Sequence, residues 1–274
     1  MQDFWINGQP GNQIDATDRG LMFGDGFFTT MAVRCRHIEN LNYHQQRVEN
    51  SLYRLGIDFS ASSVWLFVNK LATSLVNGGI KLVITRGSGG QGYQLPDPVH
   101  PSWIVTTFSF PERYKHWQKV GIRLGVASTK LGIGCSYSDL KTLNRLEQVA
   151  IKREIDVHQY DDLVVSDING NIVEASAANI FWRRGRDIFT PELSLAGIHG
   201  VMRERLLRLF DEEEFKAFSF HKGRYRLSEL RSADEIWLSN SLMPIIPIAS
   251  FEREKYSDFS FSHYLLEYLG YPLS

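Results

Sequence analysis

Between residues 163 and 190 the sequence carries four short apolar segments separated by turn-forming residues. They are Leu163–Val165, Ile172–Ala175, Asn179–Trp182 and Asp187–Thr190. Gly170 and Gly185 lie in two of the intervening segments, and glycine supplies the backbone conformations that tight turns need. The pattern predicts strands joined by hairpins. Because segments with helical spacing are interspersed along the chain, we expect an α+β fold rather than a regular alternation of parallel strands and helices.

The first part of the chain contains an amphipathic helix pattern. Val48, Leu52 and Leu55 recur at helical spacing, and Gly56 follows where a C-terminal cap belongs. Further along, PERYKHWQKVG is polar and aromatic without strand alternation. We therefore predict two domains and the segment that joins them: a small N-terminal α/β domain over 1–113, a linker over 114–120 and a larger C-terminal domain over 121–274.

The charge balance points away from large anionic partners. Lys and Arg number 30 and Asp and Glu number 31, so the formal charge is −1 and no basic tail or stripe is present. Such a chain has no electrostatic footprint for nucleic acid or for a membrane surface. We expect a local site for a small molecule.

Cysteine and histidine usage constrains the compartment and the chemistry. Only Cys35 and Cys135 occur, so no disulfide framework or thiolate zinc site is predicted. The eight histidines form no metal-binding spacing, and we expect no metal. The sequence shows neither an export signal at its start nor an apolar run long enough for a membrane span. We expect a cytoplasmic protein.

The segment GSGGQG at 87–92 satisfies the G-x-G-x-x-G pattern of dinucleotide-binding loops. That function needs a helix directly after the glycines, and the following YQLPDP contains two prolines. We therefore reject a dinucleotide site. Two interpretations stay open: a mobile glycine-rich loop, or a loop on the substrate side where Arg86 and backbone N–H groups bind a carboxylate.

Lys141 and Glu174 each allow a functional and an ordinary interpretation. Lys141 lies between leucines in DLKTLNRLEQV, and apolar neighbours can favour the neutral amine that a nucleophile requires, although a lone lysine is usually a surface residue. Glu174 lies in the apolar segment IVEASAANIF. On an edge strand it would face water, whereas inside the sheet it would need a cationic or N–H partner. A pyridinium nitrogen would be such a partner.

Two further features are typical of phosphate binding. Gly197 to Gly200 directly precede a predicted helix, so the N–H groups of a turn and of a helix N-terminus converge there. Arg47 lies one helical turn after His44 and could add a positive charge, although taken alone it is better explained as part of a solvated helix face. Each signal is weak by itself.

Together these residues resemble the fold type IV pyridoxal-phosphate enzymes, which include branched-chain and D-amino-acid aminotransferases and aminodeoxychorismate lyases. The resemblance covers nearly the whole chain. Its most specific segments are DRGLMFGDGFFTT, ITRGSGGQGY, DLKTLNRLEQV, EASAANIFW and AGIHGVMR. FGDGFFTT and LKTLNRLEQ are most similar to the bacterial lyases. The resemblance implies a two-domain α+β fold with the cofactor, pyridoxal 5'-phosphate, at the domain interface.

The resemblance also implies roles for particular residues. Lys141 would form the aldimine with the cofactor and act as the base, and Glu174 would be the partner of the pyridine nitrogen. The phosphate would be held by Arg47, by the backbone of Ile198 and His199, and by Ser241. Thr30 would donate a proton to the departing enolpyruvyl group. Substrate binding falls to Arg86 and Asn144, and Gln91 stands where the bacterial lyases carry a basic residue.

The implied activity is the conversion of 4-amino-4-deoxychorismate to 4-aminobenzoate and pyruvate, a step of folate biosynthesis. The elimination follows the cofactor's electron-accepting chemistry, which a carboxylate at the ring nitrogen strengthens. A branched-chain or D-amino-acid aminotransferase would share the cofactor residues and is the alternative. A binding protein that has lost the chemistry is disfavoured because both Lys141 and Glu174 are present. The resemblance further implies a homodimer.

Overall fold

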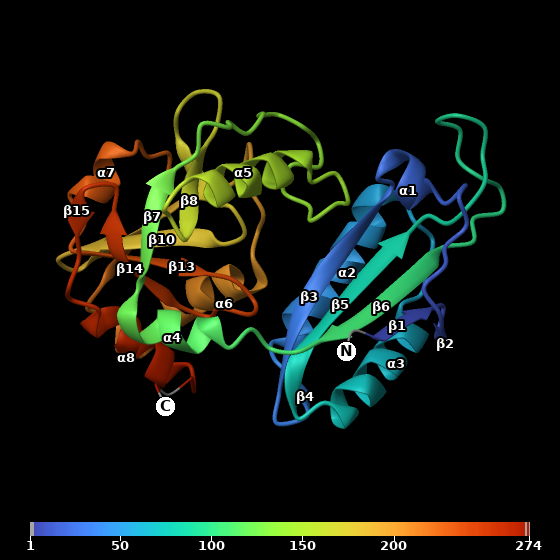
Figure 1. Ribbon diagram of the computed structural model, residues 1–274, viewed down its shortest axis with the longest axis horizontal. Helices are drawn as coiled ribbons and strands as arrows, with labels where there is room; N and C mark the ends of the chain where they lie inside the picture. The colour runs from blue at the N-terminus through green and yellow to red at the C-terminus, as the bar shows by residue number, and fades with distance from the viewer. Residues whose placement is uncertain (1–2, 272, 274) are drawn as a thin grey trace. The chain divides into compact units, whose positions relative to one another are not determined.

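The computed structural model describes residues 3–271 and 273, and within them the strands form one sheet of six strands and one of nine (Figure 1). The chain forms two compact units: residues up to Phe110 with Leu140–Asn144, and Pro111–Asp139 with the residues from Arg145 onward. The predicted α+β fold is confirmed. No helix within the described part of the chain is long and apolar enough to cross a membrane.

The first unit contains the six-stranded sheet, with strand order β2-β1-β6-β5-β3-β4, and three helices. Its elements are β1 (Asp3–Ile6), β2 (Gln9–Pro10), α1 (Arg19–Phe23), β3 (Gly26–Arg34), β4 (His37–Ile38), α2 (Leu41–Leu55), α3 (Ser62–Ser74), β5 (Asn77–Thr85) and β6 (Ser102–Phe108).

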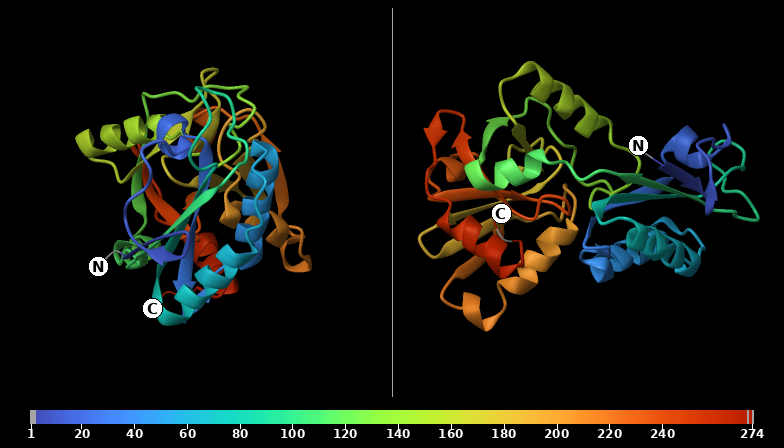
Figure 2. Two further views of the ribbon diagram at one scale, coloured as in Figure 1. Left: turned by 90° about the vertical axis from the view of Figure 1, so that its right-hand side faces the viewer. Right: turned by 60° about the horizontal axis from the view of Figure 1, so that its bottom comes forward.

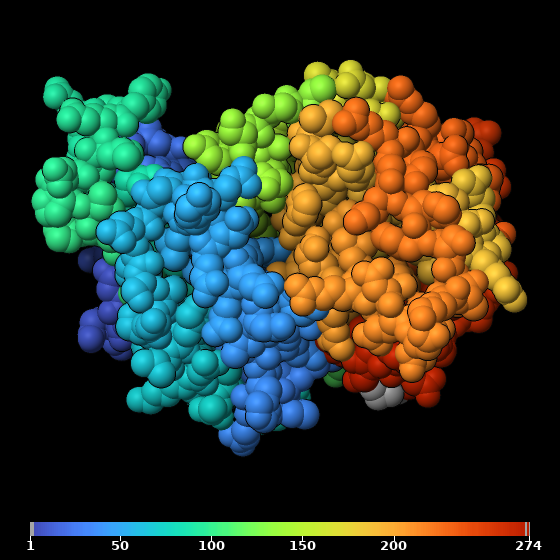
Figure 3. Space-filling model, turned by 180° about the vertical axis from the view of Figure 1, so that it is seen from behind, coloured from blue at the N-terminus to red at the C-terminus, as the bar shows by residue number. Residues whose placement is uncertain are grey.

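Helices α2 and α3 cover one face of this sheet (Figures 2 and 3). Val48 and Leu52 of α2 pack against Phe27 and Met31 of β3 in the core of the unit. Gly56 ends α2 with φ +60°, in the left-handed conformation predicted for a C-terminal cap. Successive side chains of a strand point to opposite faces of the sheet. Phe27 and Thr29 face the helices, so Phe28 and Thr30 face away from them.

The second unit contains the nine-stranded sheet, with the path β12-β11-β10-β13-β14-β7-β8-β9 and β15 paired to β14. Its elements are α4 (Arg113–Val120), β7 (Ile122–Val126), α5 (Leu146–Val157), β8 (Asp162–Ser166), β9 (Ile172–Ala175), β10 (Asn179–Arg184), β11 (Asp187–Pro191), α6 (Val201–Leu209), a 3₁₀ turn (Glu213–Phe215), β12 (Ser219–Gly223), α7 (Ser228–Arg231), β13 (Glu235–Ser239), β14 (Ile246–Phe251), β15 (Glu254–Lys255) and α8 (Ser260–Tyr268).

The structure differs from the sequence-based expectation at residues 114–120. These residues, expected as a linker, form most of helix α4 and belong to the second unit. Tyr114 and Trp117 pack against the core that contains Ile122 and Ile248. The aromatic residues that broke the strand pattern are thus partly buried against the sheet, and this packing holds the short helix in place.

Candidate active site

Lys141 lies in an extended segment that runs beside β3 in the first unit. The carbonyl oxygen of Lys141 accepts a hydrogen bond from the N–H of Phe28 (3.0 Å), and the N–H of Leu143 donates to the oxygen of Gly26 (3.0 Å). These bonds hold residues 141–143 in an extended conformation, and α5 begins only at Leu146. Pairing with β3 uses backbone groups that a longer helix would need.

The side chain of Lys141 lies against the ring of Phe28. Its Nζ is 4.7 Å from the ring centroid, within the range of a cation–π contact. Lys81 on the neighbouring strand β5 approaches the same ring at 4.8 Å. Thr30 is two residues beyond Phe28 on β3 and pairs with Lys81, so its side chain projects from the same face. The amine of Lys141 and the hydroxyl of Thr30 therefore lie on the same face of β3.

The opposite face of β3 is bound to α2 by a buried hydrogen bond. Thr29 Oγ1 and His44 Nδ1 are 2.7 Å apart, and both side chains are fully buried. Burial, followed by the charge of Arg47, lowers the pKa of His44 to about 3. The imidazole is therefore neutral, and it acts as a core residue that fixes the helix carrying half-buried Arg47.

Arg86, predicted to bind the substrate, is only 4% exposed. Its Nε and Nη2 donate to the carboxylate of Asp25 at 2.8 and 3.1 Å. The remaining donors reach the oxygens of Gly56 and Leu55, at the end of α2. This guanidinium thus binds protein groups on several sides. Its predicted role toward substrate stays a prediction, and the structure shows a bracing role.

In the second unit Glu174 lies on β9 and is 6% exposed. β9 is the last strand in the order of its sheet, yet the carboxylate is buried. Its Oε2 accepts a hydrogen bond from the N–H of Ile198 (2.9 Å). Burial lowers the pKa of the neighbouring Arg145 guanidinium, and the charges of Glu174 and Glu147 oppose this shift. The 197–200 turn therefore supplies the N–H partner that the buried carboxylate of Glu174 needs.

The turn at 197–200 differs in one respect from its predicted role. The N–H of Ile198, expected to bind phosphate, donates to Glu174 in this structure, because the carboxylate lies directly against the turn. Asn179 fixes the other side, with its Nδ2 donating to the oxygen of Ile198 (2.8 Å). Gly197 has φ +92°, and an added Cβ there would lie 2.5 Å from Val173. Helix α6 begins directly after Gly200, so its first N–H groups point toward the turn.

His199 and Ser241 complete this group of residues. His199 Nδ1 is 3.6 Å from Glu204, whose pKa is lowered by the hydrogen bond from His199 despite its burial. Ser241 follows Asn240, whose Oδ1 accepts from the N–H of Met243 (2.7 Å) and whose Nδ2 donates to Ala177 O (3.0 Å). The loop of Ser241 is thus attached to the segment between β9 and β10.

The sequence matches the family described as Amino-transferase class IV over residues 26–251. The chain belongs to this family. The chain is also similar to the aminodeoxychorismate lyase of Vibrio harveyi, with 36% identity over 250 residues that cover 90% of each chain.

Two solved structures share the fold. The 4-amino-4-deoxychorismate lyase of Pseudomonas aeruginosa superposes with a TM-score of 0.90 at 29% identity, covering 97% of each chain. A hypothetical aminotransferase from Mycobacterium tuberculosis, described in a PLP-bound form, has a TM-score of 0.82 at 17% identity and covers 98% of each chain. The predicted fold type IV architecture is therefore confirmed for this chain.

The residue types of the two units fit pyridoxal phosphate chemically. The first unit supplies a half-buried primary amine at Lys141 and a guanidinium at Arg47. The second supplies the buried carboxylate of Glu174 and the amide-rich turn before α6. An aldehyde, a phosphate and a protonated ring nitrogen require these groups. Among the described residues no three His, Cys, Asp or Glu side chains cluster as metal ligands do.

Sequence reasoning missed Asn179 and Asp25, which hold the site residues. Asn179 is 5% exposed at the start of β10, directly before three apolar residues, and this polar residue was the available signal. Asp25 lies between Gly24 and Gly26, and its partner Arg86 is 61 residues away, although Arg19 is only six residues away. Asn144, predicted to contact substrate, donates from Nδ2 to the oxygen of Gly24 (3.4 Å).

Proposed function

We propose that this protein is a pyridoxal-phosphate-dependent lyase that converts 4-amino-4-deoxychorismate to 4-aminobenzoate and pyruvate. The observation that carries the proposal is the shared face of β3, where Lys141 contacts Phe28 and Thr30 lies two residues further along the strand. A base and a hydroxyl on one surface suit an elimination, in which one group removes a proton and another donates one. The relatives named lyase support the same activity.

Each residue has a defined task in this proposal. Lys141 binds the cofactor through its amine and, once released, accepts the proton from the substrate carbon that bears the amino group. Thr30 donates a proton to the leaving enolpyruvyl oxygen. Glu174 accepts a hydrogen bond from the ring nitrogen and keeps it protonated. When bound, pyridoxal phosphate supplies the electron-accepting ring that makes the proton loss feasible.

Anchoring of the phosphate is assigned to four groups. Arg47 contributes a charge-assisted contact, and the backbone of His199 and the first turn of α6 contribute N–H donors and the favourable end of the helix dipole. Ser241 adds a hydroxyl. The Ile198 amide serves mainly to orient Glu174, as its hydrogen bond to that carboxylate supports.

The cellular setting follows from the same proposal. The reaction supplies 4-aminobenzoate for folate biosynthesis, which places the enzyme in the cytoplasm with a small-molecule substrate. We further propose that it acts as a homodimer. Analytical ultracentrifugation at micromolar concentration tests this assembly, and a monomer that retains full activity would contradict it.

The alternative is an aminotransferase, which the family description also allows. Both reactions begin with proton removal by Lys141, but transamination needs no donor to a leaving enolpyruvyl group. Incubation of the purified protein with 4-amino-4-deoxychorismate should release 4-aminobenzoate and pyruvate in equal amounts. Rapid transfer from branched-chain or D-amino acids to 2-oxoglutarate, without 4-aminobenzoate, would replace the lyase assignment by the alternative.

A further inference from the structure

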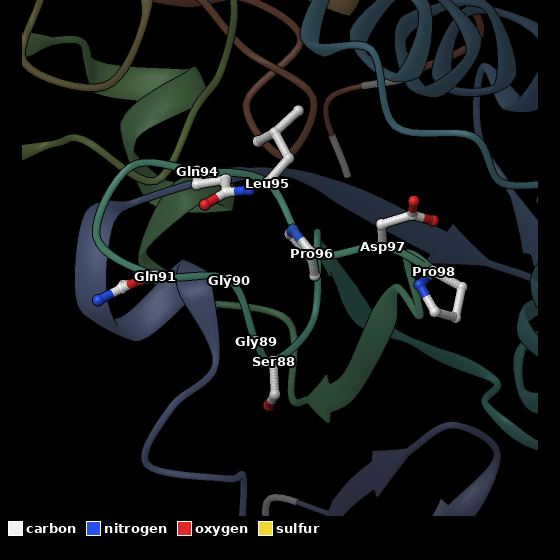
Figure 4. A pocket seen from close by; sticks show the side chains of 9 residues that line it. All are labelled: Ser88, Gly89, Gly90, Gln91, Gln94, Leu95, Pro96, Asp97 and Pro98. Atoms are coloured by element: carbon white, nitrogen blue, oxygen red, sulfur yellow. The ribbon is translucent and has the colours of Figure 1, made fainter.

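The glycine-rich loop at 87–98 has no task in the proposed function. It lines an open hollow of about 440 Å³ whose walls are residues 88–91 and 94–98 (Figure 4). Most of these side chains are exposed, so the loop has little apolar core of its own. Loops of this kind are held by hydrogen bonds or remain mobile. The residues that donate hydrogen bonds to this loop therefore decide whether it is ordered.

The guanidinium of Arg19 donates hydrogen bonds to three carbonyl oxygens of the loop. Arg19 Nη1 lies 3.4 Å from the oxygen of Gly89, 3.2 Å from that of Gly92 and 3.1 Å from that of Gln94. The side chain of Arg19 is 4% exposed. Gly90 lies against it, since an added Cβ would be 3.2 Å from Nη1 and 2.2 Å from Gln94 O. The loop is thus folded around the end of this side chain.

Arg19 is held in turn by Asp25, which also binds Arg86. The Nε atoms of Arg19 and Arg86 lie 3.0 and 2.8 Å from Asp25 Oδ2. Burial by itself would raise the pKa of Asp25, but the hydrogen bonds and charges of the two arginines hold it below its usual value. Two buried guanidinium groups thus share one carboxylate, and Arg86 continues the connection to the last carbonyls of α2.

The backbone on both sides of Asp25 contacts the segment of Lys141. Gly24 O lies 3.4 Å from Asn144 Nδ2, and Gly26 O accepts from the N–H of Leu143. Gly26 also pairs with Thr85 at the base of the loop, and Phe28 is two residues further along β3. At about 3.3 Å per residue, this places the loop base roughly 7 Å along the strand from the ring that Lys141 contacts.

We infer that Arg19 is a positioning residue that fixes the glycine-rich loop beside the Lys141 end of the sheet, so that the ordered loop contributes to substrate binding. The contribution to substrate binding rests on the proposed function, whereas the fixing of the loop does not. The Arg19–Asp25–Arg86 group connects the loop with the end of α2 and the segment of Lys141. Loss of Arg19 alone should release the loop and leave the other two attachments in place.

Hydrogen exchange of the cofactor-loaded enzyme tests the first part of the inference. In Arg19→Gln we expect amides of residues 88–95 to exchange at least tenfold faster, with unchanged exchange in α6. Arg19→Lys keeps the charge but cannot contact Asp25 and three carbonyls together, so an intermediate increase is expected. Unchanged loop exchange in both variants would overturn the inference. Gly90→Ala is a second route to the same release if Arg19→Gln fails to fold.

Steady-state kinetics test the second part. We expect Arg19→Gln to raise KM for 4-amino-4-deoxychorismate about tenfold with kcat within about twofold of the wild type, because the chemistry residues are untouched. Arg123→Gln, which breaks an exposed arginine–aspartate pair in the other unit, is the matched control and should change neither readout. A released loop with unchanged KM would overturn the substrate role. If no variant or wild type releases 4-aminobenzoate, the proposed function fails while the exchange result still decides the role of Arg19.

Discussion

Lys141 and Phe28 contact each other twice: the N–H of Phe28 donates to Lys141 O at 3.0 Å, and the Lys141 Nζ lies 4.7 Å from the Phe28 ring. The backbone contact fixes the position of the lysine along β3, and the ring limits where its amine can go. Lys141, which lies outside regular secondary structure, is thereby attached to β3 through both its backbone and its side chain.

Lys141→Ala should abolish the adduct that borohydride traps between the protein and pyridoxal phosphate. The fold should persist, because the backbone bond to Phe28 does not need the side chain. Lys81→Ala is a matched control, since its amine lies 4.8 Å from the same ring. Peptide mapping of the reduced protein measures the result, and an adduct on Lys81 would refute the assignment.

Glu174→Gln should bind the cofactor but reduce kcat by about a hundredfold or more, as for other preorganised electrostatic groups. The amide oxygen can still accept from the N–H of Ile198, so the turn should keep its shape. Single-turnover kinetics of fully loaded enzyme provide the measurement. Glu192→Gln, on the surface of the same unit, should behave as the wild type. Near-normal turnover in Glu174→Gln would remove the carboxylate from the proposal.

Arg47→Ala should weaken cofactor binding by about 10- to 150-fold, since a charge-assisted hydrogen bond contributes about 1.5–3 kcal/mol. The kcat of saturated enzyme should change much less. Fluorescence titration of the apoenzyme gives Kd directly. Arg36→Ala removes an exposed cation that donates to Thr73 O and controls for the loss of charge. Equal Kd values in the two variants would return Arg47 to the ordinary interpretation of a helix surface residue.

Thr30→Val should lose 4-aminobenzoate release while it retains cofactor binding, because the methyl group replaces the proposed proton donor at constant volume. Thr29→Val is the matched control on the opposite face of the strand, where the hydroxyl is bonded to His44. That change should lower stability, and it should leave elimination largely intact. Product release assays and thermal unfolding separate the two effects. If Thr30→Val turns over normally, another group donates the proton.

His44 should make the first unit sensitive to acid. Its pKa is lowered from 6.5 to about 3 in the folded protein, so the unfolded chain binds the proton more readily. The associated stability is complete above about pH 6.5 and is lost as the pH falls toward 3. His44→Gln should therefore flatten the decrease in unfolding free energy between pH 7 and pH 4, measured in urea. His116→Gln, at an exposed position, should leave the decrease unchanged.

Local patterns predicted the elements whose stability is local. The helix spacing of Val48, Leu52 and Leu55 with Gly56 gave α2 and its cap correctly. The hairpin strands after residue 163 appear as β8 to β11. An apolar residue is not always a sign of a strand: Phe215 ends a 3₁₀ turn, and β12 begins only at Ser219. Phe215 is fully buried, so its apolar character reflects packing and not strand formation.

The sequence by itself determined the α+β class, the presence of an amine, a carboxylate and an amide-rich turn, and the family motifs that connect them. These depend on residue type and short spacing, which the chain displays directly. Only the tertiary structure decided that the N–H of Ile198 donates to Glu174 and that Arg86 donates to Asp25. It also decided that the segment of Lys141 lies extended along β3. Each of these contacts joins residues far apart in sequence. Their hydrogen bonds form only when distant segments are brought together, so no local pattern could carry them.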